Sequence, residues 1–245
     1  MRTRSRLGTA VTLVALVVVS LGLAASADAA VILGDAFEDV GDAQKVDNTA
    51  TFGSWDTVNG ITAPASSLSF FDNATDAALT FFKKQDGELD VNENIGSGGT
   101  WRTSFVLDLD ASVAAIDLTM LDLTVTLTNG QGDLQTSTTS KDGIYTVQIQ
   151  GSVSGDLGSA SSPRTAYTSI QNQPISIDLS SFASLDDTET YTVTLSVTRG
   201  SMTWGHHISL DDMELSGDIT PTPEPASLAI LGLGGLVALR RRRRA

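Results

Sequence analysis

The sequence lacks cysteine altogether: none of its 245 residues is a Cys. This absence excludes disulfide bridges, thiolate nucleophiles and cysteine-ligated metal sites. A domain that works outside the cytoplasm without disulfides depends on its hydrophobic core, alone or with a bound ion. Histidine is also rare, since the chain has only His206 and His207. Neighbouring residues of a strand point to opposite faces, so this pair cannot easily ligate one metal ion.

Basic residues are scarce between the two ends of the chain. Of 15 Lys and Arg, three lie in the first six residues and five are Arg240 to Arg244, which leaves 7. Of 29 Asp and Glu, setting aside Asp28 and Glu224 leaves 27, so residues 30–219 carry a net charge of −20. Such a surface repels phosphate backbones, which argues against nucleic acid as a partner. The same acidic surface attracts cations. Its role is either to keep the protein soluble outside the cell or to bind calcium.

Helical periodicity is missing between residues 30 and 219. The one candidate helix, residues 72–82, ends in Phe81 and Phe82, a pair typical of a strand. Apolar residues instead alternate with polar ones, as in half-buried strands. The alternation is clearest at Trp101, Thr103, Phe105 and Leu107, and at Leu123, Val125 and Leu127. Turn residues at short intervals separate such runs, and together they predict an all-β fold, an antiparallel jelly-roll β-sandwich in one domain over residues 30–219.

The N-terminus has the layout of a secretory signal peptide. Arg2, Arg4 and Arg6 precede a mostly apolar stretch over residues 7–25, and small residues follow at Ala27-Asp28-Ala29. We predict a signal helix over residues 1–29 that signal peptidase removes after Ala29. The alternative is an uncleaved membrane anchor, because the apolar run is long for a signal.

The C-terminal segment, residues 220–245, contains Pro223, Glu224 and Pro225, then an apolar run over residues 226–239, then five arginines. As a helix the 14-residue run spans about 21 Å, whereas the hydrocarbon core of a bilayer is about 30 Å thick. This predicts a short hydrophobic helix that anchors the protein transiently. The arginines should stay on the cytoplasmic side, which puts the central domain outside the membrane.

The order of triplet, apolar run and basic end resembles the PEP-CTERM sorting signal of Gram-negative bacteria. The resemblance implies export, retention by the tail and processing by an exosortase. It also implies a final place at the cell surface or in the extracellular matrix. It is confined to the C-terminal segment and says nothing about the activity of the central domain.

The central domain carries a weaker resemblance at its two ends. The segments "GDAFEDVGD" and "ISLDDMELSG" resemble the first and last strands of jelly-roll carbohydrate-binding modules. In that family a carboxylate from each end helps to hold a structural calcium, which implies Glu38 and Asp211 as ligands, with Asp212 as the alternate. Calcium takes several oxygen ligands and tolerates loose geometry. The other interpretation is that these are solvated carboxylates at strand ends.

The segment "DVNENIG" places Asp90, Asn92 and Asn94 at the spacing of an EF-hand loop. However, Ile95 replaces the glycine of the sixth position and Trp101 replaces the glutamate of the twelfth. Both the sharp turn and the bidentate ligand are therefore missing. We predict a turn-rich loop rather than a calcium loop.

Tryptophan side chains are the candidate ligand-binding groups, because aromatic rings stack on sugar faces through the contact they also make in cores. Trp101 lies on the apolar face of its strand and is predicted to be core. Trp55 and Trp204 lie among glycines and are the candidates for an exposed sugar-binding surface, with burial in the core as the alternative.

Two functions fit the sequence. The favoured one is a non-enzymatic surface or matrix protein whose sandwich binds polysaccharide. The alternative is an extracellular glycan-active enzyme of jelly-roll fold. No catalytic residue is singled out, because paired carboxylates carry no signal in a chain so rich in acid. A groove lined by two facing carboxylates beneath exposed tryptophans would favour the enzyme.

Overall fold

The computed structural model describes residues 29–38, 49–72, 76–83, 89–92, 100–129, 134, 138, 142–199 and 206–222. Within these residues every regular element is a β-strand, and every strand pairing is antiparallel. The prediction of an all-β antiparallel fold is therefore confirmed. Jelly-roll connectivity stays a prediction. The signal helix and the tail helix were predicted for segments that lie almost wholly outside the described residues.

The larger of the two main sheets has eight strands. Its main path runs β13 (Gln173–Asp178), β9 (Val113–Asn129), β16 (His206–Pro221), β1 (Ala30–Asp35) and β3 (Thr57–Val58). At its sides, β14 (Leu185–Asp186) pairs with β9, while β7 (Leu89–Asn92) pairs with β16 and with β6 (Thr80–Lys83).

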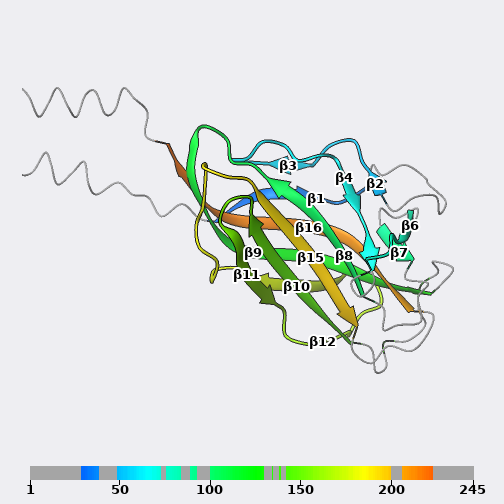
Figure 1. Cartoon of the computed structure of the whole chain (residues 1–245). Helices are drawn as coiled ribbons and strands as arrows, with labels where there is room; N and C mark the ends of the chain where they lie inside the picture. The colour runs from blue at the N-terminus through cyan, green and yellow to red at the C-terminus, as the bar shows by residue number, and fades with distance from the viewer. Residues whose placement is uncertain are drawn as a thin grey trace, which may run out of the picture.

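The second main sheet has six strands. Its path runs β11 (Gly155–Ser161), β10 (Asp142–Gly151), β15 (Tyr191–Arg199), β8 (Thr100–Leu107) and β5 (Phe71–Asp72), and β12 (Thr165–Ala166) pairs with β10. A small ribbon of β2 (Thr49–Thr51) and β4 (Ser67–Ser69) completes the fold. Figure 1 shows the two main sheets as layers, with β8, β15 and β10 on one side and β9, β16 and β1 on the other.

The core lies between the two main sheets, where their inward side chains form one buried cluster. Trp101, Phe105 and Leu107 of β8 point inward as the alternation predicts, and so do Leu123 and Val125 of β9. The indole of Trp101 also joins the sheets, because its Nε1 donates a hydrogen bond of 3.2 Å to the carbonyl of Ile208 in β16.

The strand-like end of the candidate segment over residues 72–82 is confirmed. The loop predicted from Asp90 is wrong for its first three residues, and residues 93–96 lie outside the described part of the chain. Residues 71–72 form β5 and residues 80–83 form β6, while Asp90 and Asn92 belong to β7. Backbone pairing with β16 brings Asp90 opposite Ser209. Long-range strand pairing therefore overrides the local turn composition of this segment.

The first and last strands lie side by side. Ala30 of β1 pairs with Gly217 of β16, and Asp35 pairs with Met213. Strand β16 continues to Pro221, beyond the predicted domain boundary at residue 219, because Thr220 and Pro221 still pair with β9. The chain thus enters and leaves the sandwich at the same end (Figure 1).

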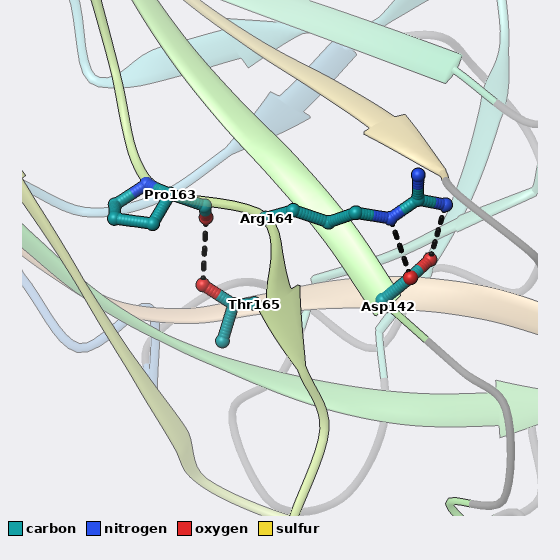
Figure 2. Close-up of polar contacts among 4 residues, drawn as sticks. All are labelled: Asp142, Pro163, Arg164 and Thr165. Atoms are coloured by element: carbon teal, nitrogen blue, oxygen red, sulfur yellow. Dashed lines mark hydrogen bonds and ion pairs between the residues drawn. The ribbon is translucent and has the colours of Figure 1, made fainter.

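A short clamp fixes the segment between β11 and β13 (Figure 2). Arg164 binds both carboxylate oxygens of Asp142, with its Nε 2.5 Å from Oδ2 and its Nη2 3.0 Å from Oδ1. The hydroxyl of Thr165 donates to the carbonyl of Pro163 at 3.0 Å. These contacts hold β12 against the start of β10. The Arg164 side chain is exposed, so water screens the ion pair and its contribution to stability is small.

Candidate functional site

A groove of about 540 Å³ lies on the outward face of β13, β9 and β16. The residues that line it are Asp122, Leu123, Thr124, Pro174, Ile175, Ser176, Asp212 and Glu214, of which Leu123 and Ile175 turn their side chains into the core. Period-two alternation places the outward members of neighbouring strands in rows, because Pro174 pairs with Thr124, and Ser176 with Asp122. We refer to this feature as the acidic groove.

Hydrogen bonds fix two of the carboxylates in the acidic groove. The hydroxyl of Ser176 donates to Oδ1 of Asp122. The hydroxyl of Thr124 donates to Oδ2 of Asp212 at 3.3 Å, and the backbone N–H of Asp212 lies at the same distance from that hydroxyl oxygen. Asp212 reaches this place because the pairing of β16 with β9 shifts register between Leu210 and Met213. The shift is a β-bulge, a device that re-aims side chains at the bulge.

Two carboxylates of the acidic groove face each other across neighbouring strands. Glu214 of β16 pairs directly with Asp122 of β9. Residues directly opposite on one face have Cβ atoms about 4.5–5.5 Å apart, and like charges at this spacing destabilise the pairing. Both carboxylates can accept hydrogen bonds from a hydroxyl-rich ligand, or attract a cation. The pair supplies acceptors and negative charge to the groove, and the exposed apolar side chain of Pro174 also lines it.

The three predicted calcium ligands come from the two strands that lie side by side. Asp211 and Asp212 occupy the bulge of β16, and Glu38 follows β1, whose last residue, Asp35, pairs with Met213. Glu38 and Asp212 are exposed, and Asp211 is half-buried. Within the described part of the chain no three Asp, Glu or His side chains are arranged to hold a metal ion. As placed, these carboxylates do not form a calcium shell, and structural calcium stays a prediction.

Trp55 is a core residue, which does not fit the predicted role in sugar stacking. Its side chain is 5% exposed and packs edge-to-face against Phe52, with ring centroids 5.0 Å apart. Phe37 and Phe105 complete this aromatic cluster. The glycines around Trp55 left an exposed loop open, but the alternative of burial holds, because the ring packs against Phe37, which follows β1, and against Phe105 of β8.

Several predicted positions lie outside the described residues. Trp204 and the sorting triplet Pro223, Glu224 and Pro225 are among them. His206 and His207 begin β16, opposite Asn129 and Thr128. Within the described residues, no helix is both long enough and apolar enough to cross a membrane.

The acidic groove was missed by reasoning from sequence. Asp122 and Glu214 are two of many acids, and neither was singled out. The available signal was the alternation itself, which places Asp122, Ser176 and Glu214 on outward faces. It could not reveal that the three strands are neighbours.

Comparison with known protein families identifies the sorting signal in the C-terminal segment. Residues 221–244 match the PEP-CTERM protein-sorting motif. The chain carries a PEP-CTERM sorting signal. PEP-CTERM proteins are exported, associate with the cell surface and are processed by an exosortase. The match begins at Pro221, the last residue of β16, so the PEP-CTERM signal follows the sandwich directly.

Similarity to solved structures is loose. A carbohydrate binding module of family 29 is 10% identical, with a TM-score of 0.32, over 61% of this chain and 92% of that one. CtCBM11 is 16% identical, with a TM-score of 0.31, over 80% and 99%. A Stig cyclase from Fischerella sp. TAU is 12% identical, with a TM-score of 0.30, over 81% and 93%. The chain matches none of the curated proteins. At these TM-scores no ligand is inferred from the likeness.

Proposed function

We propose that this PEP-CTERM protein is a non-enzymatic component of the cell surface or extracellular matrix that binds polysaccharide through the acidic groove. The observation that supports it is the lining of the groove, where fixed acceptors stand beside apolar side chains. Asp122 and Asp212 are held by hydroxyl donors, and Pro174 offers an apolar surface to the C–H face of a sugar. Binding sites for small polar ligands combine apolar walls with a few placed polar groups in this way.

The test is retention on the extracellular polysaccharide of the producing organism, using the processed protein recovered from the cell surface. Asp122→Asn and Glu214→Gln keep the shape of the groove but remove acceptors, and each is expected to weaken retention about tenfold, the loss of one to two hydrogen bonds. Asp187→Asn is the matched control, because Asp187 is exposed and lies outside the groove. Equal retention of the groove variants and the wild type would refute this assignment.

A glycan-active enzyme is the second candidate, and one observation favours it. Asp122 and Glu214 oppose each other on the floor of an open groove, and two flanking carboxylates are the usual machinery of glycoside cleavage. Among the described residues that line this groove there is no tryptophan. Incubation of the protein with the polysaccharide separates the candidates: release of new reducing ends that Glu214→Gln abolishes would favour the enzyme, and binding without such release favours the proposed function.

A further inference from the structure

The outward face of the second main sheet is rich in hydroxyl and amide groups and carries few charged side chains. We call it the hydroxyl face, and it consists of Ser104 and Val106 of β8, Thr192, Thr194 and Ser196 of β15, Thr146, Gln148 and Gln150 of β10, and Ser159 and Ser161 of β11. All of these side chains are exposed or half-buried, while their neighbours along each strand are mostly core residues. The alternation therefore sorts hydroxyls outward across four adjacent strands.

Register aligns these groups in rows across the sheet. Gln148 pairs with Thr194, and Thr194 pairs with Ser104. In the next row Ser161 pairs with Thr146, and their hydroxyls are 2.8 Å apart. Strands lie about 4.8 Å apart, and residues two apart on a strand are separated by about 6.8 Å, so the groups form a regular grid of donors and acceptors.

Two charged side chains lie in rows of this grid, because Arg102 pairs across the strands with Ser196, and Asp156 with Gln150. Arg102 of β8 pairs with Asp76, and its guanidinium carbon lies 6.0 Å from the ring centroid of Phe71. Asp156 at the start of β11 accepts a hydrogen bond of 3.0 Å from the backbone N–H of Gly158. The opposite face of the sandwich differs sharply, because Asp122, Asp178 and Glu214 all point outward there.

We propose that the hydroxyl face is a second docking surface, specific for an uncharged polysaccharide. The domain carries a net charge of −20 over residues 30–219, so it repels acidic polymers at long range. An uncharged polymer feels no such repulsion, and its hydroxyls can exchange hydrogen bonds with Thr194, Gln148 and Ser104 in place of water. The exposed side chain of Val106, 47% accessible, offers an apolar contact at the edge of the grid.

Other occupants fit this face less well. A second copy of the chain brings another charge of the same sign, and the face has few apolar side chains to offset that repulsion. A nucleic acid or an anionic membrane is repelled by the same charge. The proposal is independent of the acidic groove, since the two surfaces lie on opposite sheets.

The experiment measures retention of the surface-recovered protein on dextran and cellulose, with alginate as the acidic counterpart. The wild type is expected to be retained by at least one uncharged glucan and not by alginate, and added salt should not release it, because no ion pair is involved. Gln148→Glu and Thr194→Glu place a carboxylate in the grid, and each is expected to lower the affinity roughly tenfold. Thr194→Val removes one hydroxyl without a charge and keeps a strand-forming side chain.

Two matched variants separate this proposal from the preceding one. Thr220→Glu adds the same charge to an exposed strand position of the other sheet and should leave retention unchanged. Asp122→Asn tests the acidic groove alone. Loss of glucan retention in Asp122→Asn but not in Thr194→Glu or Thr194→Val would overturn the hydroxyl face and leave the groove standing. Failure of the wild type to bind either glucan would also overturn it, whatever the organism's own polysaccharide does.

Discussion

At the scale of single residues, a close fit surrounds two buried tyrosines, Tyr145 of β10 and Tyr167, which follows β12. The hydroxyls of Tyr145 and Tyr167 are 2.5 Å apart, and both side chains are buried. Gly143 leaves room for them, since a Cβ at this position would stand 2.5 Å from the Tyr167 hydroxyl oxygen. Glycine at 143 is therefore required by close approach rather than by backbone conformation.

Gly143→Ala is expected to destabilise the fold by about 1–3 kcal/mol, because the added methyl group pushes the Tyr167 hydroxyl from a well-packed site. Urea unfolding followed by circular dichroism gives the value. Repeating the substitution in a Tyr167→Phe background removes the crowded oxygen, so the cost of Gly143→Ala should shrink there. The same cost in both backgrounds would show that the Tyr167 hydroxyl is not the source of the strain.

The buried pair of Tyr145 and Tyr167 predicts how the stability of the fold changes at alkaline pH. Burial raises the pKa of Tyr145 and of Tyr167 above 10.0, the ordinary value, because the phenolate loses its hydration. A group whose folded-state pKa is raised contributes stability that is complete below its ordinary pKa and is lost as the pH rises toward the folded-state value. Stability should therefore fall above about pH 10, and less so in Tyr167→Phe. Ultraviolet titration of the phenolates, in parallel with circular dichroism, would contradict this if both tyrosines ionised while the fold stayed intact.

At the scale of elements, the pairing of β1 with β16 determines which carboxylates lie near one another. It brings the segment before Glu38 beside the bulge that holds Asp211 and Asp212. On the same sheet Glu214 opposes Asp122, so any cation relieves repulsion there. Specific calcium binding and diffuse screening must therefore be separated by experiment.

We predict that calcium raises the melting temperature of the protein more than magnesium does at equal ionic strength. An ion at a hundredfold excess over its dissociation constant adds about 2.7 kcal/mol to stability, and magnesium fits a loose, many-oxygen site poorly. Asp211→Ala should erase the difference between the two ions, while the control Asp187→Ala should keep it. If calcium and magnesium raise the melting temperature of the wild type equally, the protein has an acidic surface but no specific calcium site.

At the scale of the whole molecule, the two ends leave the sandwich together. Ala30 pairs with Gly217, and the backbone N–H of Thr222 still bonds the carbonyl of Ser112 at 2.8 Å. The sandwich thus keeps its outermost pairings if the chain is cut after Ala29 and anywhere beyond Thr222. Removal of residues 1–29 and of the residues after Thr222 therefore breaks none of these contacts.

Intact-mass measurement of the protein taken from the cell surface should therefore show neither residues 1–29 nor Arg240 to Arg244. A variant with alanine in place of Pro223, Glu224 and Pro225 should keep the arginines, because the sorting signal is then broken. Arginines still present on wild-type surface protein would refute exosortase processing while leaving export intact.

The sequence by itself determined the features that depend on neighbouring residues. The tail is read as a linear signal, so its triplet, apolar run and arginines identified the PEP-CTERM motif without a fold. Period-two alternation is equally local, and it correctly placed Trp101, Phe105 and Leu123 inward. The antiparallel all-β class followed from the same pattern.

Only the tertiary structure decided which distant residues meet. Glu214 faces Asp122, 92 positions earlier in the sequence, because β16 pairs with β9, and no local pattern sets that register. Packing against the distant Phe37 and Phe105 likewise buries Trp55, for which the glycine-rich surroundings had left exposure open. Alternation fixes which face of a strand each side chain occupies, but strand order decides what that face adjoins. The acidic groove and the hydroxyl face both arise at that second step.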